Sequence, residues 1–146
     1  MKYSELDLQI EDIMWFGIDK NGYIFVCTTA GYANVPKFIC DSREENEYLC
    51  NFFMNELSES TDDILNVEYD DNELINDGIS LARKGIFCFD AVVDDRLHDR
   101  EYMKIVSPID PLTYNKLPNY IQDILYKHKA DIDITKNKYL HFNHGY

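Results

Sequence analysis

The stretch of residues 12–29, DIMWFGIDKNGYIFVCTT, constrains the fold more than any other part of this chain. It contains the only Trp, and two dense apolar runs flank Asn21 and Gly22. A tight turn between strands needs positive φ angles, which Asn and Gly adopt at low cost, so Asn-Gly between apolar runs predicts a β-hairpin. We therefore expect residues 13–18 and 23–28 to pair as antiparallel strands, with the rest of the chain packed on them.

The size and charge of the chain limit what it binds. At 146 residues, we expect a single domain over residues 1–146, and a hydrophobic content of 45% is enough for a substantial core. The formal net charge at pH 7 is −13. Nucleic acids and anionic membrane surfaces attract Lys and Arg, so this charge argues against both as partners. A neutral ligand, a cation or a basic protein partner remains.

The sequence also bears on the cellular compartment. The first residues, MKYSELDLQIED, contain no apolar segment and no small-residue cleavage site, so they do not resemble a signal peptide. No apolar run approaches the roughly 18–20 residues that a transmembrane helix needs. Cys27, Cys40, Cys50 and Cys88 are widely spaced, with no C-x-x-C pair. We therefore expect a cytoplasmic protein whose cysteines are reduced and mostly buried.

Three segments have helical patterns. Residues 43–57 are the clearest, because Ser42 and Glu45 have the spacing of a capping box and apolar residues recur on one face. A weaker helical pattern covers residues 72–83, and Gly85 is expected to end this helix. A third helix is expected after Pro118, with apolar residues spaced three and four apart.

The remaining apolar runs predict strands. Residues 86–93 and 102–107 are the strongest, and a short strand is expected within 65–69. Residues 1–11 are ambiguous, because Leu6, Leu8 and Ile10 alternate as in a strand whereas Ile10, Ile13 and Met14 suit one helix face, and an irregular lead-in is favoured. Residues 37–40 are expected to be a short extended piece, and residues 139–142 part of a late hairpin or edge strand. This order of elements is typical of an α+β domain, mainly an antiparallel sheet with two to three helices on one face.

Motifs for catalysis or metal binding are weak. The segment Asp19-Lys20-Asn21-Gly22 resembles the middle of an EF-hand loop, but the positions for the first and twelfth ligands are Gly17 and Thr28. His141 and His144 lack nearby cysteine or carboxylate ligands for zinc, apart from two aspartates upstream. The sequence contains no G-x-S-x-G, Walker or G-x-G-x-x-G motif. We therefore expect a protein that is not an enzyme and uses no cofactor or metal.

The most suggestive functional feature is an acidic belt. Residues 41–73 contain twelve Asp or Glu residues and one basic residue, Arg43. Such a belt is either a solvated face that keeps the protein soluble or a surface that docks a basic partner. Aromatic residues within charged surfaces are typical interface anchors. The predicted partner-binding residues are Glu44, Glu45, Tyr48, Glu56, Asp62, Asp63, Tyr69, Asp70 and Asp71.

The chain loosely resembles small bacterial immunity-type proteins of polymorphic toxin systems. The resemblance spans most of the chain and rests on structural turns and strands: WFGIDKNGYI at 15–24, Gly31, Val35-Pro36, GIFCFD at 85–90, residues 105–108 and Leu117-Pro118. It implies a cytosolic antidote that binds and blocks one basic toxin domain, such as a nuclease. It assigns no individual site residues.

Two other functions are also compatible with the sequence. The chain could be a regulatory or structural module that self-associates, for example as a homodimer, through an exposed strand at 102–107 or in the C-terminal tail. It could instead bind a small ligand in an aromatic pocket near Trp15, Tyr23, Phe25 and Phe87.

Overall fold

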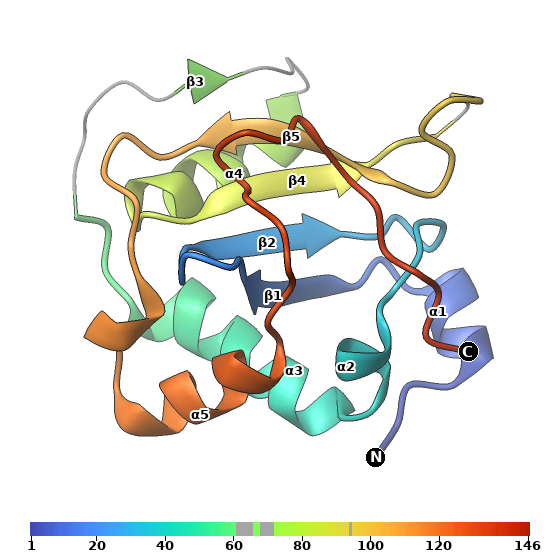
Figure 1. Ribbon diagram of the computed structural model, residues 1–146, viewed down its shortest axis with the longest axis horizontal. Helices are drawn as coiled ribbons and strands as arrows, with labels where there is room; N and C mark the ends of the chain where they lie inside the picture. The colour runs from blue at the N-terminus through green and yellow to red at the C-terminus, as the bar shows by residue number, and fades with distance from the viewer. Residues whose placement is uncertain (61–65, 68–71, 94) are drawn as a thin grey trace.

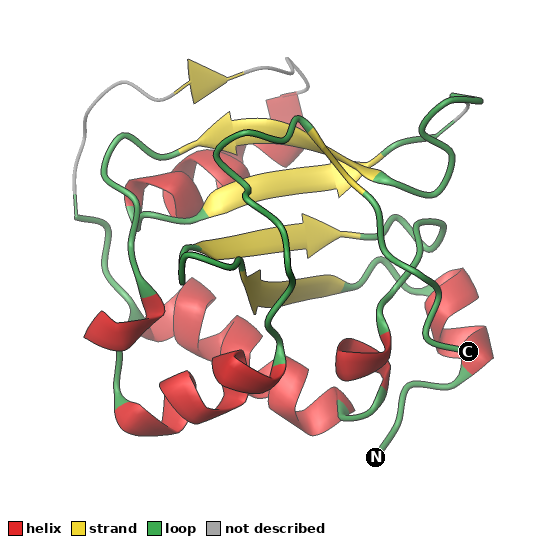
Figure 2. Ribbon diagram, viewed as in Figure 1, coloured by secondary structure: helices red, strands yellow, loops and turns green. Residues whose placement is uncertain are grey.

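The computed structural model describes residues 1–60, 66–67, 72–93 and 95–146, which form an α+β fold around one mainly antiparallel sheet (Figures 1 and 2). The predicted fold class is therefore confirmed. The strands run in the order β1-β2-β4-β5-β3, and β6 also pairs with β5. Among the paired strands of the described residues, β2 and β4 run parallel and the other pairs are antiparallel. The strands are β1 (Met14–Ile18), β2 (Ile24–Thr28), β3 (Asn66–Val67), β4 (Phe87–Ala91), β5 (Tyr102–Ser107) and β6 (Tyr139–Leu140).

The predicted hairpin forms at β1 and β2. Its register places Met14 opposite Thr28 and Ile18 opposite Ile24. Gly22 has a φ of +82°, which explains why the turn needs glycine at this position. The carboxylate of Asp19 accepts hydrogen bonds from backbone N–H groups within the same turn.

The three predicted helices are confirmed. Residues 43–57 become a helix that changes to a π-helical turn partway along, Gly85 follows the second helix with a φ of +96°, and the third helix begins after Pro118. The helices are α1 (Glu5–Ile10), α2 (Lys37–Cys40), α3 (Arg43–Asn51), α4 (Asn72–Arg83) and α5 (Asn119–Lys127), with the π-helical turn η1 (Phe52–Glu56) and the 3-10 turn η2 (Tyr114–Lys116).

Two predicted irregular or extended segments are helical instead. Residues 1–11 contain α1, because Ser4 and Asp7 cap each other's backbone N–H groups in a capping box with Asp in place of the usual Glu. Residues 37–40 form α2 and not an extended piece. Pro36 has the extended backbone that is typical of the residue just before a helix, and its carbonyl accepts the first helical bonds.

The third strand region and the tail agree with the prediction where they are described. The structure places β3 inside the expected range of 65–69, and the other residues of that range lie outside the described part of the chain. β6 is an outer strand, as expected for residues 139–142, although it is only two residues long. In contrast, β5 is not an exposed strand, because it lies between β4 on one side and β3 and β6 on the other.

Side chains cover both faces of the sheet, so the expectation that all helices share one face is wrong. One face packs against α3, α4 and α5. The other carries Trp15, which is fully buried, and is covered by α1, α2 and the C-terminal segment that crosses in front of the strands (Figure 1). Short helices at 5–10 and 37–40 were not predicted, which is why the second helical layer was missed.

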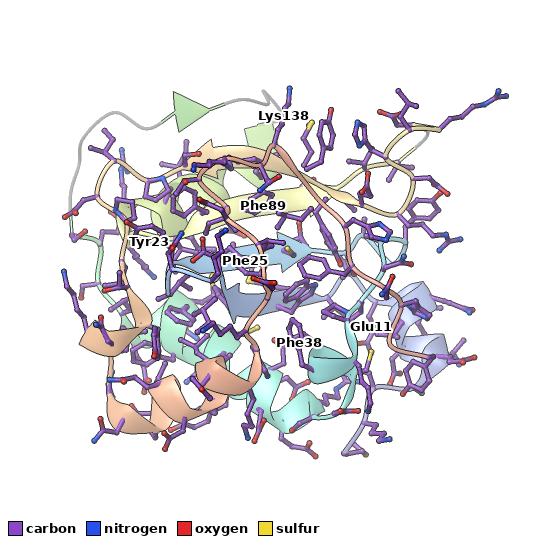
Figure 3. The ribbon with its side chains drawn as sticks, in the orientation of Figure 1. Glu11, Tyr23, Phe25, Phe38, Phe89 and Lys138 are labelled. Carbon is purple, nitrogen blue, oxygen red and sulfur yellow. The ribbon has the colours of Figure 1, made fainter. Side chains whose placement is uncertain are left out.

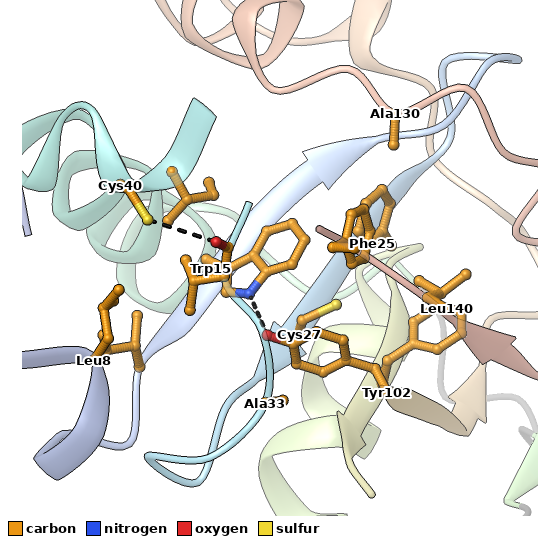
Figure 4. Packing of buried hydrophobic residues seen from close by; sticks show 14 of the residues in the cluster. Leu8, Trp15, Phe25, Cys27, Ala33, Cys40, Tyr102, Ala130 and Leu140 are labelled. Carbon is orange, nitrogen blue, oxygen red and sulfur yellow. Dashed lines mark hydrogen bonds between the residues drawn. The ribbon is translucent and has the colours of Figure 1, made fainter. Parts of the chain in front are cut away.

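The aromatic residues proposed to line a ligand pocket instead form this second core layer. Trp15 and Phe25 are fully buried, and Phe87 is 5% exposed. The indole N–H of Trp15 donates to the hydroxyl of Tyr102 over 3.1 Å (Figure 4). Figure 3 shows Tyr23, Phe25 and Phe89 on the face that the C-terminal segment crosses. Three cavities found among the described residues are lined by other side chains and by none of the four aromatic residues proposed to line a pocket.

Candidate functional site

Four of the nine predicted partner-binding residues lie in the described part of the chain. Glu44, Glu45 and Tyr48 belong to α3, and Glu56 is the last residue of η1. The structure therefore brings these four onto one continuous helical segment. The other five predicted residues lie outside the described residues: Asp62, Asp63, Tyr69, Asp70 and Asp71.

The helix α3 is held in a fixed orientation against the edge strand β1. The hydroxyl of Ser42 accepts the N–H of Glu45 at the start of the helix. Asn46 is buried, and its amide donates to the carbonyl of Met14 over 2.9 Å and to the hydroxyl of Tyr3. Because Asn46 and Leu49 turn inward, the opposite side of α3 faces solvent and carries Tyr48.

This exposed side of α3 forms a groove with α5. The groove has a volume of about 300 Å³, and we call it the tyrosine groove. The rings of Tyr48 and Tyr120 meet edge to face, with centroids 5.8 Å apart and an angle of 72° between the ring planes. Their exposed fractions are 50% and 47%, so both rings remain available to a partner. The lining residues are Glu44, Glu45, Tyr48, Tyr120 and Ile124.

Charges around the groove are partly paired within the chain. Glu45 forms an ion pair with Lys127 of α5, and Glu44 forms one with the amino group of Met1. Both pairs are exposed, and exposed ion pairs contribute little energy and exchange readily. Partial burial raises the pKa of Tyr120, and the neighbouring Tyr48 and Glu56 raise it further. Glu56 therefore acts electrostatically on the groove although it does not line it.

The sequence prediction named three of the five residues that line this groove and missed the two from α5. Tyr120 and Ile124 come from α5, about 70 residues after α3, and lie outside the acidic belt. The sequence did contain one signal: Tyr120 lies four residues before Ile124, at the edge of the apolar face that Ile121 and Leu125 form. A large aromatic residue on the solvent side of a helix is an interface candidate. Choosing it required knowing that α3 and α5 are neighbours.

The π-helical turn η1 is stabilised by a buried lysine. The ammonium group of Lys84 donates to the carbonyl of Phe53 over 2.6 Å and to that of Met54 over 3.2 Å. Burial lowers the pKa of Lys84. These carbonyls lie at the end of a helix, where they lack helical partners. Lys84 thus fixes the position of the turn that carries Glu56.

The four cysteines are free thiols whose pKa values are all raised by burial. Burial raises the pKa of Cys40 to about 11 and that of Cys50 to about 12. Thiols with raised pKa values are poor nucleophiles at neutral pH. Within the described residues, no group of three or more His, Cys, Asp or Glu side chains has the arrangement of a metal site. The tyrosine groove presents aromatic rings next to carboxylate groups.

Comparisons with known proteins add no further constraint. No protein-family model, curated protein or solved structure matches this chain. Among the described residues, none of the helices has the length and apolar character that crossing a membrane requires.

Proposed function

We propose that this chain is a non-enzymatic binding protein that docks a basic protein partner on the tyrosine groove. In this proposal it acts as an immunity-type antidote and neutralises a basic toxin domain such as a nuclease. The observation that carries the proposal is the groove itself, where two half-exposed tyrosines lie among glutamates on a chain of net charge −13. The proposal that the partner is a toxin rests on the resemblance to immunity-type proteins.

Physical reasoning supports a protein partner over a solvated face. Tyr is enriched among the residues that dominate interface energetics, because it offers large rigid contact area and a polar tip. Carboxylates beside such anchors favour a basic partner, increase the association rate and make it sensitive to salt. A face that served solubility alone would have no need for Tyr48 and Tyr120 to be half exposed side by side.

The first experiment captures the partner. The tagged protein is incubated with extract of the source cells at about 50 mM and at about 500 mM NaCl, because the higher salt screens surface charges. We expect one basic protein that is retained at low salt and lost at high salt. When this protein is expressed alone, it should inhibit growth, and co-expression of the present chain should restore growth. Failure to retain a basic protein at low salt would contradict the proposal.

A matched pair of charge reversals then tests the surface. Glu56 is exposed and acts electrostatically on Tyr120 of the groove, whereas Asp110 is an exposed carboxylate that does not line the groove, so the two variants are Glu56→Lys and Asp110→Lys. Because each variant changes the net charge by the same amount, any difference in their binding affinities is due to the position of the changed residue. We expect Glu56→Lys to weaken binding of the captured partner by about tenfold and Asp110→Lys by less than about threefold. If both variants weakened binding equally, the acidic surface would be a solvated face and not the binding site.

A further inference from the structure

We propose that the tyrosine groove binds one arginine side chain of the partner, with the guanidinium group held between tyrosine rings and glutamate carboxylates. This inference rests on the proposed function and specifies which chemical group the site recognises. A groove of about 300 Å³ is at the small end of ligand sites, so it fits one side chain better than a cofactor.

The aromatic part of the groove provides the surface for a cation. Tyr48 and Tyr120 each keep about half of their surface accessible. A cation placed over a tyrosine ring is attracted by the negative charge of the ring face. Ile124, which also lines the groove, provides an apolar contact for the methylene stem of a long side chain.

The carboxylates favour arginine over other groups. Glu44 and Glu45 line the groove, and Glu56 is close enough to influence Tyr120. A guanidinium is planar, so it can stack on a ring while its edge N–H groups donate to carboxylates. A lysine ammonium is compact and more strongly hydrated, and it cannot satisfy both contacts as well. The ion pairs of Lys127 and the Met1 amino group leave the carboxylates able to accept further donors.

The same recognition chemistry occurs within this molecule. The guanidinium of Arg43 lies 5.2 Å from the ring centroid of Tyr3 and forms ion pairs with three carboxylates, those of Asp7, Glu11 and Glu47. A second guanidinium, that of Arg100, lies 4.6 Å from the ring centroid of Tyr32. The tyrosine groove presents the ring and carboxylate half of the arrangement around Arg43, on an open surface.

The test uses peptides that differ in one group. The probe is the pentapeptide acetyl-Gly-Ser-Arg-Ser-Gly-amide, compared with versions that carry citrulline or lysine at the central position. Citrulline keeps the shape of arginine and removes its charge. Binding is followed by the NMR signals of the tyrosine rings in the full-length protein. We expect the arginine peptide to shift the Tyr48 and Tyr120 signals and to bind about tenfold more tightly than the citrulline peptide and about threefold more tightly than the lysine peptide.

Variants of the protein locate the binding. Tyr120→Leu removes the ring and should weaken binding of the arginine peptide by about fivefold or more. Tyr120→Phe keeps the ring and should retain most of the binding. Tyr126→Leu is the matched control, because Tyr126 is a more exposed tyrosine on the same helix that does not line the groove. Circular dichroism melting checks that each variant is folded.

The outcomes separate this inference from the proposed function. Equal binding of the arginine and citrulline peptides, or equal effects of Tyr120→Leu and Tyr126→Leu, would overturn the arginine site. Stronger binding of lysine than of arginine would also overturn it. If either result occurs while Glu56→Lys still weakens binding of the captured partner, the proposed function stands and only the arginine inference fails. If the peptides bind as expected but the captured partner is indifferent to Glu56→Lys, the proposed function fails instead.

Discussion

The carboxylate of Asp19 accepts a hydrogen bond from the backbone N–H of Ile134, 115 residues further along the chain, over 3.1 Å. Its other oxygen accepts the N–H groups of Asn21 and Tyr23 in the hairpin turn. Asp19 is fully buried, so these bonds replace the water that the carboxylate would otherwise bind. One side chain therefore shapes the β1–β2 turn and ties the C-terminal segment to it.

Replacement of Asp19 by Asn should destabilise the protein. An amide has one acceptor oxygen, so the N–H groups of the turn and of Ile134 cannot all be satisfied, and an N–H group of the amide would face another donor. We expect a loss of about 2–3 kcal/mol in the free energy of unfolding, measured with urea at pH 7. Asp131→Asn, an exposed aspartate shortly before the same C-terminal segment, should change it by less than about 0.5 kcal/mol. Similar losses in both variants would contradict this role of Asp19.

Tyr102 connects two parts of the core through its hydroxyl group. It accepts the indole N–H of Trp15 and donates to the carbonyl of Asn34 over 2.8 Å. Tyr102→Phe removes both bonds with little change of shape and leaves the buried indole N–H of Trp15 and the partly buried carbonyl of Asn34 without this partner. We expect a loss of about 1–3 kcal/mol, with a shift in the fluorescence of the only Trp. An unchanged urea midpoint would show that water or small movements satisfy these groups.

The imidazole of His128 is buried, and one of its two nitrogens has a hydrogen-bond partner among the described residues. Nδ1 lies 3.0 Å from the carbonyl of Phe16, so Nδ1 carries the proton and donates. Nε2 is buried and has no hydrogen-bond partner in the described part of the structure. Burial lowers the pKa of His128. Protonation of Nε2 would place a charge and an unpaired donor inside the core.

His128 should therefore make stability depend on pH. As the pH falls below about 6.5, the unfolded chain binds a proton at this residue while the folded protein does not, so stability is lost. The contribution is complete above about pH 6.5 and decreases toward the lower pKa of the folded state, by at most about 1.4 kcal/mol per pH unit. Unfolding in urea at several pH values between 5 and 8 measures this slope.

Two histidine variants isolate the effect from other titrating groups. In His128→Gln, the slope between pH 5 and 7 should be smaller than in the wild-type protein, although the variant is less stable throughout. His144→Gln changes an exposed histidine near the C-terminus and should keep the wild-type slope. A wild-type slope in His128→Gln would show that another group controls the pH dependence.

Local sequence patterns were sufficient to predict the main strands and long helices. The Asn21-Gly22 turn and the apolar repeat of α5 are local signals, and each works within a few residues. The helix α1 was missed because its apolar residues alternate as in a strand, while the Ser4 capping box that decides the outcome has an Asp at its second position. The helix α2 is four residues long, too short for a repeat to be visible.

The candidate site was predicted only on the side that is continuous in sequence. Tyr48 was named because it lies among acidic residues, whereas Tyr120 was not, since its importance comes from the packing of α5 against α3. The buried positions of His128 and Lys84 were equally hidden. A polar residue is buried only when distant backbone atoms satisfy it, and no local pattern reports which atoms those are.

Lys84 provides the last prediction, which concerns the geometry of the candidate site. Its ammonium group caps the carbonyls of Phe53 and Met54 at the end of η1, and Lys84→Met keeps the length of the side chain but removes the donor. We expect a loss of about 1–3 kcal/mol in the free energy of unfolding, since both carbonyls would lack this donor. Because η1 carries Glu56, the NMR signal of the Tyr120 ring should also shift. Lys116→Met, an exposed lysine, should change neither quantity, and a stable variant with an unchanged Tyr120 signal would show that η1 holds its shape without Lys84.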